Sequence, residues 1–87
     1  MEIKIIYLPR AQADHLYWKK SGNKGIQLRI SKLIQSILET PFEGIGKPEA
    51  LKHDFTGWWS RRINEEHRLV YQVEDGKITI AQMRFHY

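Results

Sequence analysis

The sequence predicts an α+β domain in which an antiparallel β-sheet carries two N-terminal helices on one face. One short alternating segment opens the chain, two segments with helical periodicity follow, and three further alternating segments close it. Helices that are grouped before the strands, rather than interleaved with them, are typical of this class. The length of 87 residues suits a single domain, which we expect to span residues 1–87.

The first two elements are a strand and a helix. Residues 2–8 alternate apolar and polar side chains as a strand does, and Pro9 ends the alternation. Residues 10–20 are predicted to form a helix, with two lysines near its C-terminus, where the helix dipole favours cations. The side chains expected to face the core are Ala13, Leu16 and Tyr17.

The second helix, predicted over residues 24–39, has the clearest apolar stripe in the chain. A break at residues 21–23 precedes it, and Thr40-Pro41 ends it because a residue before proline disfavours helical geometry. The stripe consists of isoleucines and leucines at helical spacing: Ile26, Ile30, Leu33, Ile34, Ile37 and Leu38.

The second half of the chain is predicted to contain a long loop and three strands. Residues 42–57 hold three glycines and indicate a loop with little regular structure, of a length that is often functional. Residues 58–63 form the next predicted strand. Residues 67–73 and 77–85 then flank an Asp-Gly pair, which is a favoured two-residue hairpin turn.

The hairpin turn also predicts how the last two strands pair. Counting back from it gives four pairs: Glu74 with Lys77, Val73 with Ile78, Tyr71 with Ile80, and Leu69 with Gln82. The face away from the helices then carries Arg68, Val70, Gln72, Thr79, Ala81 and Met83. The same alternation sends His86 to the face opposite Arg68, so a bulge or a free chain end is required if both serve one site.

The charge is unevenly spread, with a formal net value of +4. Residues 1–42 hold seven Lys and Arg against three acids, whereas residues 43–87 hold seven of each. A basic half suits a polyanion or an acidic partner, and a solvated helical surface is the plainer explanation. Cysteine is absent, and neither a membrane span nor a signal peptide is evident, so we expect a cytoplasmic protein.

Residues 47–71 combine a carboxylate, several cations and two adjacent tryptophans, and the last four residues repeat that mixture. The histidines lack metal-ligand spacing and no serine lies in a nucleophile motif, so we expect neither a metal nor a cofactor. Metal-free RNA cleavage fits better, because RNA carries its own nucleophile, the 2′-hydroxyl. The enzyme then supplies a base, cations for the phosphorane and an acid.

The residues that can fill these roles are Glu49 as base, Arg68 with Arg62 as cations, and His86 as acid. Lys52 adds positive charge, and the rings of Trp59, Phe85 and Tyr87 can stack on bases. Each also has a plainer interpretation. Glu49 alone is a solvated loop acid, one of the two tryptophans is core, one of Arg61 and Arg62 faces solvent, and His67 lies at the core rim.

Five segments carry a resemblance to a known family: Thr40-Pro-Phe-Glu-Gly, Gly46-Lys-Pro-Glu-Ala-Leu-Lys-His, Trp59-Ser-Arg-Arg-Ile, Glu65-Glu-His-Arg-Leu-Val-Tyr and the terminal Arg84-Phe-His-Tyr. In this order they resemble the YoeB/Txe family of toxins, within the RelE superfamily. The resemblance covers nearly the whole chain and implies a RelE-like, microbial-RNase-like fold. It also implies a ribosome-dependent mRNA endonuclease, an mRNA interferase, that cuts mRNA in the A site of the 70S ribosome and stops translation.

The resemblance implies roles for single residues and for partners. Glu49 falls on the general base, Arg68 on the arginine that stabilises the transition state, and His86 with Tyr87 on the general acid and a positioning ring. Lys52 and Arg62 fall on auxiliary cations. An antitoxin of the YefM/Phd type is implied, with operator DNA bound only through the antitoxin complex, and homodimers occur in the family.

The basic residues of the two helices are expected to contact ribosomal RNA: Lys19, Lys20, Lys24, Arg29 and Lys32. Two alternatives stay open, a non-catalytic module that binds RNA or an antitoxin, and a ribonuclease that works without the ribosome. Glu49 argues against the first, because an acid beside a phosphate costs affinity unless it moves a proton. A single histidine near the site argues against the second.

Overall fold

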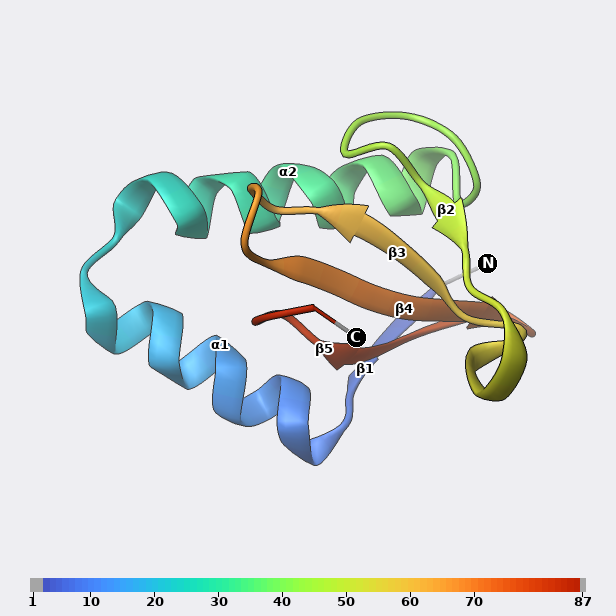
Figure 1. The fold of residues 1–87 in the computed structure, drawn as a ribbon, viewed down its shortest axis with the longest axis horizontal. Coiled ribbons are helices and arrows are strands. Elements are labelled where there is room, and N and C mark those ends of the chain that lie inside the picture. Colours follow the sequence, from blue (N-terminus) through green and yellow to red (C-terminus); the bar gives the residue numbers. More distant parts are fainter. Residues whose placement is uncertain (1–2, 87) are drawn as a thin grey trace.

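The structure of the protein is a computed structural model that describes residues 3–86. Its elements follow in the order β1 (Lys4–Tyr7), α1 (Pro9–Ser21), α2 (Lys24–Glu39), β2 (Glu49–Ala50), the 3₁₀ turn η1 (His53–Phe55), β3 (Trp59–Arg62), β4 (Arg68–Glu74) and β5 (Lys77–Gln82). Figure 1 shows the two helices joined by a short link at one end, with the strands beside them. The predicted α+β class, two helices on one face of a sheet, is confirmed.

The five strands form one sheet in the order β1-β5-β4-β3-β2. Three neighbouring pairs are antiparallel, as predicted, and β1 pairs with β5 in parallel, with Ile5 beside Ile78 and Tyr7 beside Ile80. A parallel pair needs a long connection between its strands, and here both helices and the other three strands lie between them in sequence. The first and last strands are therefore neighbours, and the sheet is mixed rather than purely antiparallel.

The second helix agrees with its predicted bounds. The carbonyl oxygen of the Asn23 side chain accepts a hydrogen bond from the backbone N–H of Ile26 at 3.1 Å and caps the first turn of α2. Gly22 ends α1 with φ 72°, a left-handed geometry that glycine adopts without steric cost. The predicted apolar stripe of α2 faces the sheet, and its fully buried members are Ile30, Leu33 and Ile37.

The first helix forms as predicted, but the prediction of its inward face is wrong. Leu16 and Tyr17 are 48% and 45% exposed, and Ala13 is exposed as well. The buried residues are Ala11, Asp14 and Trp18. Asp14 lies inward because its carboxylate accepts the backbone N–H of Met83 at 2.9 Å, and the Trp18 indole N–H donates to the Met83 carbonyl at 2.9 Å. Two polar contacts to the end of the chain thus fix the rotation of α1.

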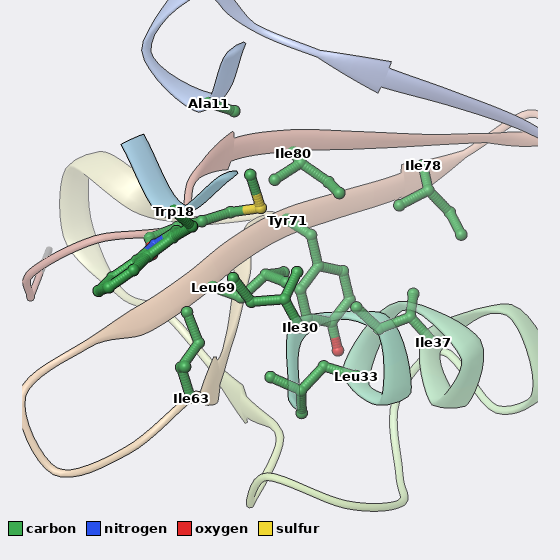
Figure 2. Close-up of a cluster of buried hydrophobic side chains, with 11 residues drawn as sticks. Ala11, Trp18, Ile30, Leu33, Ile37, Ile63, Leu69, Tyr71, Ile78 and Ile80 are labelled. Carbon is green, nitrogen blue, oxygen red and sulfur yellow. The ribbon is translucent and has the colours of Figure 1, made fainter. Parts of the chain in front are cut away.

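The core lies between the sheet and the helices. Figure 2 shows the Tyr71 ring pointing from β4 toward α2, where it lies among Ile30, Leu33 and Ile37. The remaining fully buried members come from both helices and from the strands: Ala11, Trp18, Ile63, Leu69, Ile78, Ile80 and Met83. Each buried aliphatic side chain contributes about 1.5–3 kcal/mol of transfer free energy, which holds the sheet against both helices.

The hairpin register is confirmed near the turn and differs at its far end. Tyr71 pairs with Ile80 as predicted, but Val70 pairs with Gln82, so the predicted pair of Leu69 with Gln82 is wrong. One step along β4 corresponds to two along β5, which makes Ala81 the extra residue of a β-bulge. The alternation of faces is therefore inverted beyond the bulge, and Met83, predicted on the face away from the helices, is buried in the core.

The loop predicted over residues 42–57 contains more structure than expected. β2 adds an edge strand to the sheet, and η1 forms a single turn further on. The start of the loop is held by Arg61, whose guanidinium donates to the carbonyls of Thr40, Glu43 and Ile45 at 2.7, 2.9 and 3.2 Å. A side chain from β3 thus orders a segment that its own sequence leaves irregular.

Candidate active site

The face of the sheet away from the helices, here called the open face, carries a row of residues that crosses four strands. Glu49 of β2 pairs with Ser60 of β3, Ser60 pairs with Val70 of β4, and Val70 pairs with Gln82 of β5. Residues directly opposite each other in neighbouring strands project to the same face. Because Ser60 and Val70 are buried, they form the base of any site on this face.

The next row on the open face brings two arginines together. Arg62 of β3 pairs with Arg68 of β4, two residues along each strand from Ser60 and Val70. A cavity of about 140 Å³ lies over these rows and is lined by Lys47, Glu49, Ser60, Arg62, Arg68 and His86. The structure therefore brings four of the predicted site residues together. Tyr87, the remaining member of the predicted catalytic set, lies outside the described residues.

His86 reaches this cavity because the chain changes face at the bulge in β5. Beyond Gln82 the segment leaves the sheet, and the Phe85 carbonyl accepts the backbone N–H of Arg68 at 3.0 Å. The Gln82 side chain donates to the His86 carbonyl at 3.0 Å, and His86 Nε2 lies 3.3 Å from the Glu65 carbonyl oxygen. The bulge that the sequence required for a shared site is thus present, at Ala81.

The Glu49 side of the cavity depends on a close backbone approach at Gly46. The Gly46 carbonyl accepts the backbone N–H of Arg62 at 2.7 Å, which extends the pairing of β3 with the segment before β2. Gly46 has φ +84°, and a Cβ there would lie 2.6 Å from the Leu33 side chain. Only glycine fits this position, and the approach brings Lys47 and Glu49 over the sheet.

Arg68 is held from its own side of the cavity. Its Nη1 donates to the carbonyls of Asn64, Glu65 and His67 at 2.7, 3.1 and 3.1 Å. All three contacts use one nitrogen of the guanidinium and come from the turn between β3 and β4. The turn therefore fixes the position of the charge, and Nε and Nη2 make no hydrogen bond within residues 3–86 that competes with an anion.

Two residues that line the cavity, Lys47 and Ser60, were not predicted from the sequence. Lys47 stands two positions before Glu49 in an extended segment, and residues at that spacing share a face, so the spacing is a signal that predicts it. Ser60 lies in β3 between Glu49 of β2 and Val70 of β4, and it alternates with Arg61. With Lys47, the cavity lining holds three permanent cations and one carboxylate, so its field favours an anionic group.

Three other predicted residues lie outside this cavity. Lys52 lines a neighbouring, wider hollow of about 700 Å³ that shares Glu49 with it. The Trp59 ring packs against Phe42 at 4.8 Å between centroids and contacts the core, on the helix side of β3. The Phe85 ring is largely exposed next to the cavity and lies 5.5 Å from the His67 ring.

The basic residues predicted to contact ribosomal RNA differ in their surroundings. Lys19, Lys20, Lys24 and Lys32 are exposed on α1 and α2. The half-buried Arg29 instead donates to the carbonyls of Ile63 and Arg62 at 3.3 and 3.2 Å. Four of the five side chains are thus accessible, and the fifth also ties α2 to the end of β3.

Neither a metal cluster nor a membrane helix is found in the part of the chain that the structure describes. Within residues 3–86, His, Asp and Glu side chains nowhere gather in a group of three that would hold a metal ion. No helix among the same residues has the length and apolar character needed to cross a bilayer. The carboxylate and the imidazole that line the cavity are those of Glu49 and His86.

This chain is similar in sequence and fold to bacterial toxins. Residues 7–87 match the sequence profile of a family described as YoeB-like toxin of bacterial type II toxin-antitoxin system. Toxin YoeB of Escherichia coli strain K12 is 51% identical over 85 residues, covering 98% of this chain and 100% of the relative. The class defined by fold and profile is thus the toxin component of a type II toxin–antitoxin system.

Solved structures agree with the profile. The structure of the YoeB dimer from Staphylococcus aureus is similar with a TM-score of 0.90 and 44% identity, over 100% of both chains. A YoeB–YefM complex from the same organism gives a TM-score of 0.89 and 45% identity, again over 100% of both chains. The chain belongs to the YoeB-like toxin family, and the resemblance found in its sequence is confirmed.

Proposed function

We propose that the protein is a ribosome-dependent mRNA endonuclease that cuts the message in the ribosomal A site by metal-free acid–base catalysis and inhibits translation. The observation that carries the proposal is the cavity of about 140 Å³ on the open face. It places a carboxylate and an imidazole around two arginines and a lysine. Cleavage of RNA through its 2′-hydroxyl needs these groups in one place.

In the proposed reaction Glu49 takes the proton of the 2′-hydroxyl, and the oxygen attacks the adjacent phosphorus. The 2′-O–P bond forms as the P–O5′ bond breaks, and His86 donates its proton to the leaving 5′-oxygen. The products are a 2′,3′-cyclic phosphate and a 5′-hydroxyl. In this proposal Nε and Nη2 of Arg68 stabilise the phosphorane, and Arg62 adds a second charge from the neighbouring strand.

The remaining predicted residues take supporting roles in this proposal. Lys52 supplies positive charge from the hollow next to the cavity, and the exposed ring of Phe85 stacks on a base beside the cut. Tyr87 positions the substrate from the end of the chain. Trp59 contributes through the core side of β3, because its ring packs on Phe42.

In this proposal the protein contacts the ribosome through its two basic helices. The four exposed lysines of α1 and α2 form a phosphate-binding surface for ribosomal RNA, with Arg29 between them on α2, and such contacts weaken as salt rises. We further infer an antitoxin partner of the YefM type, since a YoeB toxin of Staphylococcus aureus forms a YoeB–YefM complex. Operator DNA is bound only through that complex. A homodimer is inferred from the YoeB dimer of the same organism, and the site of action is the cytoplasm.

The test is in vitro cleavage of a translated mRNA, mapped by primer extension, with and without ribosomes. The wild-type protein is expected to cut only when ribosomes are present, and His86→Gln is expected to cut at least about a hundredfold more slowly. Cuts without ribosomes would identify a free ribonuclease instead. Absence of cuts, with antitoxin or ribosome binding intact, would identify a non-catalytic binding module.

A further inference from the structure

The last described residues, 83–86, form a C-terminal segment that is held outside the sheet by hydrogen bonds from side chains. At its start, Asp14 and Trp18 of α1 hold the backbone N–H and carbonyl of Met83, each at 2.9 Å. In its middle, the Arg84 carbonyl accepts from Arg10 and Gln82 at 3.3 and 3.0 Å. The segment therefore has a defined path up to the residue before His86.

At the end of the segment the contact is made by His67. The backbone N–H of Phe85 donates to His67 Nδ1 at 2.8 Å. A ring nitrogen that accepts a hydrogen bond carries no proton, so the proton of the neutral imidazole lies on Nε2, 3.1 Å from a Glu66 carboxylate oxygen. The hydrogen bond at Nδ1 specifies the tautomer, and the Glu66 carboxylate lies on the Nε2 side of the ring.

The surroundings of His67 fix it in place. The residue is 6% exposed, and its ring meets the Trp18 ring edge-on at 4.9 Å between centroids. The Phe85 ring covers another side at 5.5 Å. A buried imidazole with rings on two sides has little rotational freedom, so its Nδ1 is a fixed acceptor for the chain that passes over it.

Phe85 needs such an acceptor because its backbone is strained. Its φ of 60° lies in the left-handed region, which costs a residue with a side chain about 1 kcal/mol and persists only when contacts enforce it. Two contacts do so, from His67 Nδ1 to the Phe85 N–H and from the Arg68 N–H to the Phe85 carbonyl at 3.0 Å. The strained residue directly precedes His86, so its geometry decides where the imidazole of His86 points.

We propose that His67 is a positioning residue for RNA cleavage: its unprotonated Nδ1 fixes the backbone of Phe85 and thereby holds His86 at the cavity. The proposal rests on the proposed function, in which His86 is the acid. The His67 side chain is not part of the cavity lining and acts on the site through the backbone of Phe85. Because Asp14 and Trp18 hold Met83 independently, loss of the His67 acceptor releases residues 85 and 86 while the start of the segment stays anchored.

The experiment compares two substitutions that differ in one acceptor atom. His67→Leu fills the buried space without an acceptor, whereas His67→Asn places a carbonyl oxygen close to the position of Nδ1. In single-turnover cleavage on programmed ribosomes, His67→Leu is expected to react about tenfold or more slowly, because small misplacements of a catalytic group have large effects. Ribosome affinity is expected to change less than about twofold, and His67→Asn to recover most of the rate.

A second readout follows the free protein and does not depend on catalysis. The amide proton of Phe85 is expected to exchange with solvent at least about tenfold faster in His67→Leu than in the wild type and in His67→Asn, as measured by NMR. Trp18→Phe is the matched control. It removes the indole donor to Met83 but keeps a ring against His67, so the Phe85 amide is expected to stay protected.

The outcomes separate this proposal from the proposed function. A His67→Leu protein that cleaves at the wild-type rate, or that keeps the Phe85 amide protected, overturns the positioning role. Equal loss of rate in His67→Leu and His67→Asn overturns the role of the acceptor atom. A wild-type protein that cuts nothing overturns the proposed function. The exchange rate of the Phe85 amide proton is then the only test of whether His67 fixes the segment. Should His67→Leu not fold, His67→Phe takes its place in both measurements.

Discussion

Arg61 and Arg62 are adjacent in β3 and lie in opposite environments. Arg61 points to the helix side, is 0% exposed, and donates to the Tyr71 hydroxyl, the Ser36 hydroxyl and three loop carbonyls. Arg62 points to the open face and lines the cavity. One guanidinium has its hydrogen bonds satisfied within the fold, and the other is available to an anion. A charge on this sheet is therefore structural or functional according to the face that it occupies.

The largest expected effect is the loss of folding stability when the buried arginine, Arg61, is replaced. Arg61→Ala leaves one buried and four part-buried acceptors without their donor, so the free energy of unfolding is expected to fall by about 3–5 kcal/mol. Arg62→Ala, at the neighbouring exposed position, is expected to change it by less than about 0.5 kcal/mol. Urea denaturation followed by tryptophan fluorescence measures both. Similar values for the two variants would show that the faces are not as different as the hydrogen bonds indicate.

The next largest effect is a loss of cleavage activity when Arg68 on the open face is replaced. Arg68→Ala removes the charge that stabilises the phosphorane in the proposed reaction, so single-turnover cleavage on ribosomes is expected to fall about a hundredfold or more. The free energy of unfolding is expected to change by about 1 kcal/mol or less, because the residue contributes three hydrogen bonds to a partly exposed turn. Full cleavage by a folded Arg68→Ala protein would refute the assignment of the site.

The smallest effect is a pH dependence on the helix side. Burial raises the pKa of Tyr71 above its usual value of 10.0, and the hydrogen bond and charge of Arg61 partly oppose this. The folded state thus binds this proton more tightly than the unfolded state. The resulting stability is fully present below pH 10.0 and is lost as the pH rises above it. Acids with depressed pKa values would give the opposite sign.

Tyr71→Phe sharpens this test. The variant loses the hydroxyl that donates to the Pro41 carbonyl at 2.7 Å and accepts from Arg61, so its stability at neutral pH is expected to fall by about 1–3 kcal/mol. Its further loss of stability above pH 10.0 is expected to be smaller than that of the wild type. Some alkaline loss remains, because burial also raises the pKa of Tyr7. Equal slopes for both proteins in alkaline urea titrations would contradict the role of Tyr71.

The elements that the sequence predicts well are those with a strong local signal. The stripe of α2 and the Asp-Gly turn depend on spacing within a few residues, and both agree with the structure. The prediction of the inward face of α1 was wrong because Asp14 is buried by its contact with Met83, a partner 69 residues away. No local pattern reports such a contact.

The sequence predicted which residues form the candidate site better than it predicted how they are arranged on the sheet. Alternation placed Arg68 correctly on the open face, but it could not locate the extra residue at Ala81 that brings His86 to the same side. It could not tell which of Arg61 and Arg62 is buried, because both have the same chemistry and only the loop carbonyls distinguish them. The roles of the single residues were inferred from their chemistry and from the family resemblance, and they stay predictions.

The bulge at Ala81 makes the faces of the chain end depend on where residues are added to or lost from β5. Deleting Ala81 would remove the bulge but leave Gln82 opposite Val70 and Met83 on the core side, because Gln82 would then directly follow Ile80. Inserting one residue between Gln82 and Met83 would instead send Met83 to the open face and turn His86 away from the cavity. Position 81 is therefore expected to tolerate substitution and even loss, whereas the number of residues from Gln82 to His86 is the property that natural variation must preserve.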